Sequence, residues 1–371
     1  MTSLNILIVI DEFETNYPRD QNYIIRYMLE KGNDVTVLTT KNTRFELYDR
    51  IFFPRASIVR APTLIKIKKA KIFFGLDTFK ALLCKYDVAH AFTFFTFSSI
   101  LNALTRAQIK VIRSEIGPPN ALNFRKALHI EPYRSLIYIY KSMYSYFTVY
   151  NIIERQSLKL LGFPDEYIVI LPPMIDFYKY SSLTRAKYTD DTINIGVIAR
   201  ISPEKGIHRL IPIMKKLVVR IPNFYKKIKL LLAGRIDNYN YARRVLRELK
   251  RILGRSFVYM GEVALPYEFY RSVDIILIPS LTETGAITCL EAMAARKVVI
   301  ASNIYPINLY IINGKNGFLF NMVSKATEVL VEIINESIDM QRVLNNASRY
   351  AMKHDYRYVC QKLERVYKYA T

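Results

Sequence analysis

The stretch IILIPSLTETGAITCLEAMA, residues 275–294, reads as a buried strand, a loop and the start of a helix. Its first four residues are apolar and mostly β-branched, which is typical of a strand inside a parallel sheet. A glycine and small residues then open the helical segment, and free backbone N–H groups at a helix start can bind an anion. The stretch therefore predicts a strand–loop–helix unit of an α/β fold, with a ligand site at the loop.

Two carboxylates lie eight positions apart in this stretch, Glu283 before the predicted helix and Glu291 inside it. A carboxylate next to a phosphate is repelled, so both side chains are better suited to accept hydrogen bonds from the hydroxyls of a ribose and a sugar. Gly285, Ala286 and Ile287 lie between them and would present backbone groups to the ligand. Ordinary surface carboxylates around a helix start are the alternative interpretation.

A second polar segment, Arg200 to Gly206, directly follows the apolar run Ile193 to Ile198. Ligands of open α/β sheets bind outside the carboxyl ends of the strands. Arg200 and Lys205 at such a place suit a diphosphate and could stabilise the charge that develops on a departing nucleoside diphosphate. The alternative is that both side chains belong to a solvated basic face.

Short apolar runs alternate with amphipathic stretches along the chain, which favours two open, doubly wound domains. The predicted strands are 4–10, 34–39, 87–91, 110–113, 145–149 and 167–171 in the first half, and 193–198, 228–233, 257–260, 275–278 and 298–301 in the second. Asp20 is predicted to cap the first helix, and Gly32 to end it. Pro212 is predicted to kink a helix that starts near Gly206. The segment from Tyr356 to Tyr367 predicts a terminal helix that docks elsewhere on the molecule.

The composition limits the classes of protein. The 371 residues suggest two or three domains, and 54 Lys and Arg against 32 Asp and Glu give a net charge of +22. Such a charge points to anionic partners.

The three cysteines are scattered, so we expect neither a disulfide framework nor a zinc cluster. We expect the protein to reside in a reducing compartment. We expect no signal peptide and no membrane-spanning helix. The many Ile, Lys and Tyr residues suggest a thermophilic source.

In this order and spacing, the motifs resemble the retaining glycosyltransferases of family 4, which have the GT-B fold. The resemblance rests on Glu-x7-Glu from Glu283 to Glu291 and on the run from Arg200 to Gly206, with supporting matches at 170–176 and 313–318. It covers residues 165–320 and extends loosely over the rest. It implies two Rossmann-like, doubly wound parallel-sheet domains facing a cleft: an acceptor-side domain over 1–175, a nucleotide-sugar domain over 176–350, and a terminal helix over 351–371 that crosses back to the first domain.

The resemblance also implies a function. It implies a metal-independent, retaining hexosyltransferase, without a cofactor, that moves a sugar from a nucleotide-sugar donor to a lipid, glycan or protein acceptor. By position, Arg200 and Lys205 would bind the donor diphosphate, Glu283 would meet the transferred sugar and Glu291 would hold the ribose. The remaining implied contacts with the donor come from Gly285, Ala286, Ile287, Glu262, Val263 and His90.

Three places depart from the family pattern, and each concerns contacts with the sugars or phosphates. Residues 11–18 hold no glycine where the family often has a Gly-Gly pair. His90 matches the first histidine of the family's Asp-x-x-His-x-His strand end, but Phe92 replaces the second. Residues 305–309 replace the family's Gly-Gly-x-x-Glu loop. These changes suggest an unusual acceptor or donor sugar. His90 as a purely structural histidine is the alternative interpretation.

Other functions remain open. Another GT-B activity, such as a sugar-nucleotide epimerase or a phosphorylase, would use the same motifs. A basic nucleic-acid-binding protein would fit the charge but would leave the Glu-x7-Glu spacing unexplained.

The basic residues gather in two blocks: residues 51–150 hold 15 basic and 4 acidic residues, and residues 200–260 hold 16 and 3. From the first block, with Lys66, Lys71 and Arg125 among apolar neighbours, we predict a cytoplasmic enzyme that docks reversibly on an anionic membrane. Such an enzyme would reach a lipid or lipid-linked acceptor. A protein acceptor is the alternative.

Overall fold

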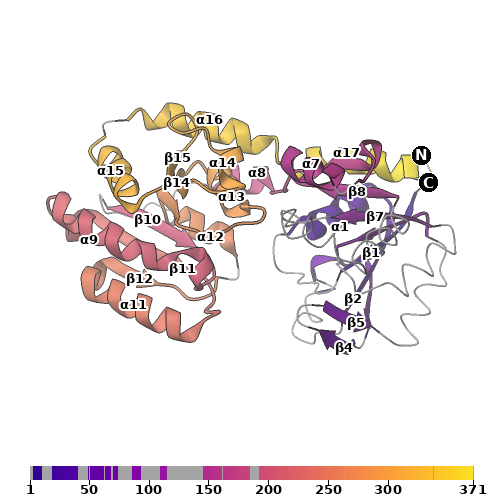
Figure 1. Ribbon diagram of the computed structural model, residues 1–371, viewed down its shortest axis with the longest axis horizontal. Coiled ribbons are helices and arrows are strands. Elements are labelled where there is room, and N and C mark those ends of the chain that lie inside the picture. Colours follow the sequence, from indigo (N-terminus) through magenta and orange to yellow (C-terminus); the bar gives the residue numbers. More distant parts are fainter. Residues whose placement is uncertain are drawn as a thin grey trace. The chain divides into compact units, whose positions relative to one another are not determined.

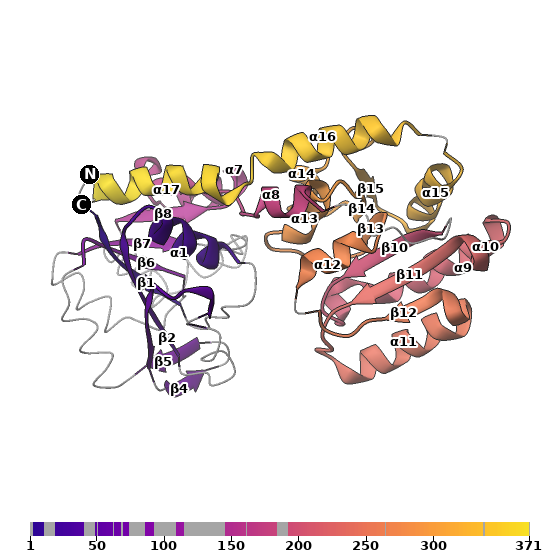
Figure 2. The same ribbon diagram turned by 180° about the vertical axis from the view of Figure 1, so that it is seen from behind.

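The computed structural model describes two compact units (Figures 1 and 2). Unit 1 comprises Met1–Met174 and Tyr356–Thr371, and unit 2 comprises Ile175–Asp355. The described residues are 3–10, 19–40, 49, 51–61, 63–67, 70–73, 86–92, 109–114, 145–160, 162–183, 192–263, 265–336 and 338–370. The side chains of the hairpin at 63–73 are outside this description, as are residues 11–18 and 115–144. The side chains of the basic residues at 66–71, and all of residues 125–141, which belong to the predicted membrane contact, therefore lie outside what the structure describes.

Unit 1 is built on a seven-stranded sheet with the order β3-β2-β1-β6-β7-β8-β9. Its neighbouring strands pair in parallel. The strands are β1 (Asn5–Val9), β2 (Asp34–Thr40), β3 (Ser57–Ala61), β6 (Val88–Ala91), β7 (Lys110–Ser114), β8 (Tyr146–Val149) and β9 (Ile168–Ile170). A separate antiparallel pair is formed by β4 (Thr63–Ile67) and β5 (Ala70–Phe73). The described helices are α1 (Asp20–Glu30), α7 (Ile152–Leu160), η1 (Asp165–Tyr167) and α17 (Tyr356–Ala370).

Alternate residues of β1 enter different cores, which is why both sides of this sheet must be covered. Ile6 and Ile8 pack with α1 and α17, whereas Leu7 and Val9 pack with the opposite group of apolar residues. Helix α17 buries Val359, Cys360, Leu363 and Tyr367 in the first of these cores. The end of the chain thus supplies a helix to the unit with which the chain begins.

Unit 2 is built on a six-stranded parallel sheet with the order β12-β11-β10-β13-β14-β15. Its strands are β10 (Ile193–Ile198), β11 (Ile228–Ala233), β12 (Phe257–Tyr259), β13 (Ile275–Ile278), β14 (Val298–Ser302) and β15 (Phe318–Phe320). The longer helices are α9 (Leu210–Arg220), α11 (Tyr239–Leu253), α13 (Ile287–Ala294), α15 (Val323–Ile334) and α16 (Met340–Met352). The shorter ones are α8 (Phe177–Ser181), η2 (Pro203–Lys205), η3 (Ile207–Arg209), α10 (Phe224–Lys227), η4 (Gly254–Ser256), α12 (Pro266–Arg271) and α14 (Ile307–Tyr310).

The helices of unit 2 divide between two sides of the sheet. Leu230 and Leu232 of β11 pack with α9, α11 and α15, whereas Leu231 and Ala233 pack with α8, α12, α13 and α14. Parallel sheets covered on both sides are typical of doubly wound folds. The predicted class is therefore confirmed for both units, and the predicted strands occur within one or two residues of their expected bounds.

Two local predictions were wrong. Asp20 does not cap α1, because its side chain is buried and turned to Tyr150 and Met174 instead. Pro212 does not lie inside a helix that starts near Gly206, because the segment begins as the 3₁₀ turn η3 and α9 starts only at Leu210. Pro212 is then in the first turn of α9, where a missing N–H costs no intrahelical bond. By contrast, Gly32 ends α1 with a positive φ of 83°, as expected.

Candidate functional site

The loops that follow β10 and β13 meet at the carboxyl edge of the second sheet. These two strands are neighbours, so the polar segments after them are adjacent although they are about 80 residues apart in the chain. The Leu281 N–H donates to the Glu204 carbonyl over 2.8 Å. Gly206 has a φ of 63°, and a Cβ atom there would lie 2.1 Å from the Pro279 carbonyl oxygen. Only glycine therefore permits this approach of the two loops.

The contact between the loops brings Lys205 and Glu283 together. The Lys205 Nζ atom lies 2.8 Å from Glu283 Oε1, and Ser280 Oγ donates to the same oxygen over 2.6 Å. Both charged side chains are largely enclosed, with 19% and 12% of their surface exposed. The two residues predicted to contact the diphosphate and the transferred sugar are thus direct neighbours.

Arg200 lies in the same loop as Lys205 and is about half exposed. Its guanidinium forms a hydrogen-bonded ion pair with Asp237 and lies 3.2 Å from a Glu204 carboxylate oxygen. Asp237 follows β11 and also accepts from Arg235 over 3.0 Å. Acidic neighbours on two loops therefore hold the Arg200 side chain at the edge of the sheet.

Glu291 lies on the helix that follows the Glu283 loop. Its side chain projects from the middle of α13 and is buried, at 5% exposure. The Tyr180 hydroxyl donates to Oε1 over 2.6 Å and the Tyr270 hydroxyl to Oε2 over 2.8 Å. Burial raises the pKa of this carboxyl to about 7, although the two tyrosine hydroxyls act in the opposite direction. Both of its oxygens are occupied by protein groups that the sequence did not reveal.

The remaining predicted residues of unit 2 lie on two loops, one before α13 and one after the edge strand β12. Gly285 and Ala286 precede α13, which starts at Ile287, and Ala286 has the left-handed φ of 47°. Glu262 is exposed and Val263 half-buried, and both follow the edge strand β12. The Gly234 N–H donates to the Gly261 carbonyl over 2.7 Å, which ties the end of β11 to that loop.

His90 belongs to unit 1, so the structure does not group it with the residues above. It is fully buried at the end of β6, where its ring nitrogens contact the Tyr367 hydroxyl at 2.7 Å and Ser114 Oγ at 2.8 Å. Phe92 stacks on its ring at a centroid distance of 4.4 Å. Burial and the charge of Arg113 lower the pKa of His90 to about 3, so the imidazole is neutral at ordinary pH.

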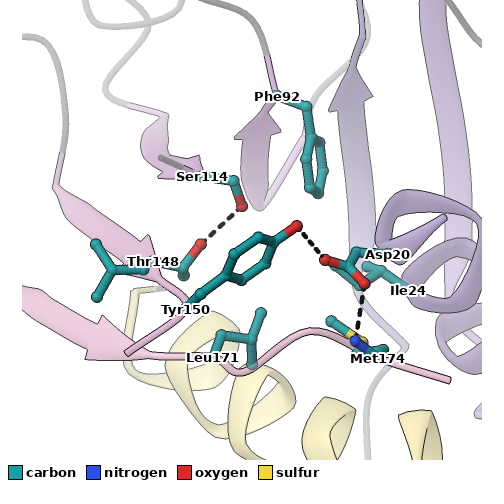
Figure 3. A pocket seen from close by; sticks show the side chains of 9 residues that line it. Asp20, Ile24, Phe92, Ser114, Thr148, Tyr150, Leu171 and Met174 are labelled. Atoms are coloured by element: carbon teal, nitrogen blue, oxygen red, sulfur yellow. Dashed lines mark hydrogen bonds between the residues drawn. The ribbon is translucent and has the colours of Figure 1, made fainter. Parts of the chain in front are cut away.

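A small pocket lies at the carboxyl edge of the first sheet (Figure 3), and two of its lining residues, Phe92 and Ser114, contact His90. Tyr150 crosses its middle and donates to Asp20 Oδ2 over 2.5 Å, and the Met174 N–H donates to Oδ1 over 2.9 Å. Ser114 and Thr148 form a hydroxyl pair at 2.7 Å on the opposite wall. The pocket has room for about one water molecule, to which its hydroxyl groups and carboxyl could hydrogen-bond. The sequence analysis missed Asp20 and Tyr150, because the residues that meet here are 130 positions apart.

Burial dominates the electrostatics of this pocket. It raises the pKa of Asp20 to about 6, although the hydrogen bonds from Tyr150 and Met174 act to lower it.

Among the residues that the structure describes, no group of three or more His, Cys, Asp or Glu side chains could hold a metal ion. Within the same residues, no helix is long and apolar enough to cross a bilayer.

Comparison with known proteins finds similarity over the second half of the chain. Residues 185–354 match the family described as "Glycosyl transferases group 1". Trehalose synthase of Thermococcus litoralis is 28% identical over 204 residues, which cover 49% of this chain and 48% of that protein. The capsular polysaccharide biosynthesis glycosyltransferase CapM of Staphylococcus aureus is 26% identical over 186 residues, covering 49% and 47%. The chain thus spans about half the length of the curated relatives it matches.

Solved structures resemble the whole chain. The structure of Anabaena HepE in complex with UDP and glucose has a TM-score of 0.75 at 15% identity, covering 99% of this chain and all of that one. A glycosyltransferase of Rickettsia africae has the same TM-score and identity, with 100% and 99% coverage. The predicted GT-B fold is confirmed by this likeness and by the two parallel sheets.

Proposed function

We propose that this chain, which has a domain of the glycosyl transferases of group 1 over residues 185–354, moves a sugar from a nucleotide-sugar donor to a hydroxyl-bearing acceptor. The observation that carries the proposal is the contact of Lys205 with Glu283. It unites a phosphate-binding cation and a hydroxyl-accepting carboxylate at the carboxyl edge of β10 and β13. That edge is where ligands of such sheets bind.

The proposed roles follow from the chemistry of each group. Lys205 and Arg200 bind the donor diphosphate and stabilise the charge that develops on it as the glycosidic bond breaks. Glu283, held by Lys205 and Ser280, accepts hydrogen bonds from the transferred sugar. The ion pairs in the donor-free chain keep the cations at the sheet edge, so that little side-chain entropy is lost when the donor binds.

The same proposal includes retention of the anomeric configuration without a metal ion. In a front-face displacement, the acceptor attacks on the face from which the diphosphate leaves, so the configuration is retained. The departing diphosphate must then be held by cations, and Lys205 and Arg200 supply these charges from the protein. UDP-glucose is the first donor to test, since UDP is bound in the structure of Anabaena HepE. Lipid, glycan and protein acceptors all offer the hydroxyl that the reaction requires.

The test is the affinity for UDP and the release of sugar from UDP-glucose, both measured with EDTA present. Lys205→Ala should weaken UDP binding by about 1.5–3 kcal/mol in calorimetry, because a charge-assisted hydrogen bond is lost. Lys325→Ala is the matched control, since Lys325 also pairs with a carboxylate, Glu328 at 3.2 Å, but lies on α15. It should bind UDP like the wild type.

Two further measurements separate donor binding from sugar transfer. Glu283→Gln should bind UDP normally but release or transfer sugar far more slowly, and NMR should show a product anomer of the same configuration as the donor. Unchanged UDP affinity in Lys205→Ala would remove the donor site from this edge. An inverted product, or activity that EDTA abolishes, would contradict the proposed chemistry.

A further inference from the structure

Helix α11 of unit 2 has an outward face made of cations. Its buried face holds Tyr241, Ala242, Val245, Leu249 and Leu253, which pack in the core against α9. The opposite stripe consists of Arg243, Arg244, Arg247, Lys250 and Arg251, all exposed. These positions recur at intervals of three and four residues, so they share one face of the helix.

The neighbouring helices extend this positive face. Helices α9 and α11 cover the same side of the sheet and lie side by side in both views (Figures 1 and 2). Lys215, Lys216 and Arg220 are exposed on α9, and Lys226 and Lys227 on α10, which follows it. We call these five cations and the five of α11 the basic surface. At a rise of 1.5 Å per residue, it extends about 12 Å along α11, from Arg243 to Arg251.

One carboxylate lies within the basic surface. Glu248 is 2.7 Å from Arg251 and 3.3 Å from Lys215, and it therefore connects the two helices. The hydrogen bond with Arg251, together with that of Lys215, lowers the pKa of Glu248 to about 2, so it remains ionised. A single negative charge among ten positive ones leaves a strong positive potential, which attracts anionic partners.

Apolar side chains lie among the cations. Val219 on α9, Tyr225 on α10 and Tyr239 at the start of α11 are 86%, 56% and 70% exposed. A bilayer of anionic lipids offers both an extended negative charge and an apolar layer just beneath it, and interfacial tyrosines are favoured there. A nucleic acid offers the charge but gives no account of an exposed valine.

We propose that the basic surface of α9, α10 and α11 docks unit 2 on a membrane of anionic phospholipids. Helices α9 and α11 run from the carboxyl edge of the sheet, where the donor site lies, to its amino edge, where α10 precedes β11, so the basic surface covers a side of unit 2. The docking itself is independent of the proposed function, since none of these residues contacts the donor-site residues Lys205 or Glu283.

The experiment is cosedimentation of the full chain with phosphatidylcholine vesicles that contain no or about one third phosphatidylglycerol, at low and high salt. We expect binding to the anionic vesicles at low salt, loss of that binding at high salt, and no binding to neutral vesicles. The variant Arg243→Glu/Arg247→Glu/Lys250→Glu should bind on the order of 100-fold more weakly. The matched control, Arg342→Glu/Arg349→Glu/Lys353→Glu, changes the net charge equally on the exposed side of α16 and should bind like the wild type.

Three outcomes would overturn the proposal: no vesicle binding at low salt, equal losses in both triple variants, or a wild-type preference for RNA or DNA over vesicles that the α11 variant abolishes. Release of sugar from UDP-glucose without vesicles serves as an independent reading. It should be equal in all three proteins, so a failure of docking and a failure of the proposed transferase activity are distinguishable.

Discussion

Burial raises the pKa of the Glu291 carboxyl from 4.5 to about 7, while hydrogen bonds from Tyr180 and Tyr270 act against that rise. Because the pKa in the folded state exceeds that in the unfolded chain, protonation favours folding. This stabilisation is fully present below about pH 4.5 and is lost as the pH rises through 7. Titration of Glu291 should therefore make the wild type less stable in neutral solution than in mild acid.

The variant Glu291→Gln removes this titration and keeps the shape of the side chain. We expect its free energy of unfolding, relative to the wild type, to rise by on the order of 3 kcal/mol between pH 4.5 and 8. Urea unfolding at several pH values measures the difference. Asp20→Asn is the control: its own change should fall lower, between about pH 3.8 and 6. A difference between Glu291→Gln and the wild type that does not vary with pH would show that this carboxyl does not titrate as inferred.

At the scale of the element, α13 ends with a residue that its backbone does not favour. Arg296 has a φ of 54°, and the N–H groups of Arg296 and Lys297 bond to the carbonyls of Met293 and Ala292. This is the hydrogen-bond pattern of a Schellman motif, whose left-handed position usually holds glycine. Helix α1 has the same pattern with Gly32 at that position. Comparing α1 with α13 therefore isolates the energetic cost of a side chain at the left-handed position.

Arg296→Gly should therefore stabilise unit 2 by about 1 kcal/mol, since the left-handed conformation carries no penalty for glycine. Arg296→Ala is the matched control, because it removes the exposed charge and keeps the penalty. Chemical unfolding monitored by circular dichroism would measure both. Equal stability of the two variants would assign the effect to the charge instead of to the backbone.

The elements show which features a sequence makes visible. Runs such as 193–198 and 275–278 predicted strands, because short runs of β-branched apolar residues are typical of buried strands. The motifs that follow these two runs predicted that Lys205 and Glu283 belong to one site, and the two side chains are in contact. The sequence could not reveal that Asp20 bonds to Tyr150, 130 positions away, or that Tyr180 reaches Glu291. Strand β15, Phe318–Phe320, was not predicted. Local sequence signals thus predicted the helices and strands. The hydrogen bonds between buried polar groups far apart in the chain became visible only in the structure.

At the scale of the whole molecule, the chain passes between the two units twice, once after Met174 and once after Asp355. The two passages are joined on the side of unit 2: the Ile175 N–H donates to the His354 carbonyl and the Phe177 N–H to Asp355 Oδ2, each over 3.0 Å. Unit 2 is one continuous segment, whereas unit 1 needs α17 from the far end of the chain. Loss of packing on α17 should therefore be felt in unit 1.

Two buried leucines make this separation measurable. Leu363 of α17 and Leu249 of α11 are both fully buried on helices, one in each unit. Replacing either by alanine should cost about 2–5 kcal/mol, because a cavity remains where the side chain was. In hydrogen exchange read by mass spectrometry, Leu363→Ala should reduce protection in peptides covering β1 and β2, and Leu249→Ala in those covering β10 and β11. If Leu363→Ala exposed both groups of peptides equally, the two units would unfold as one, and their separate cores would not be separate units of stability.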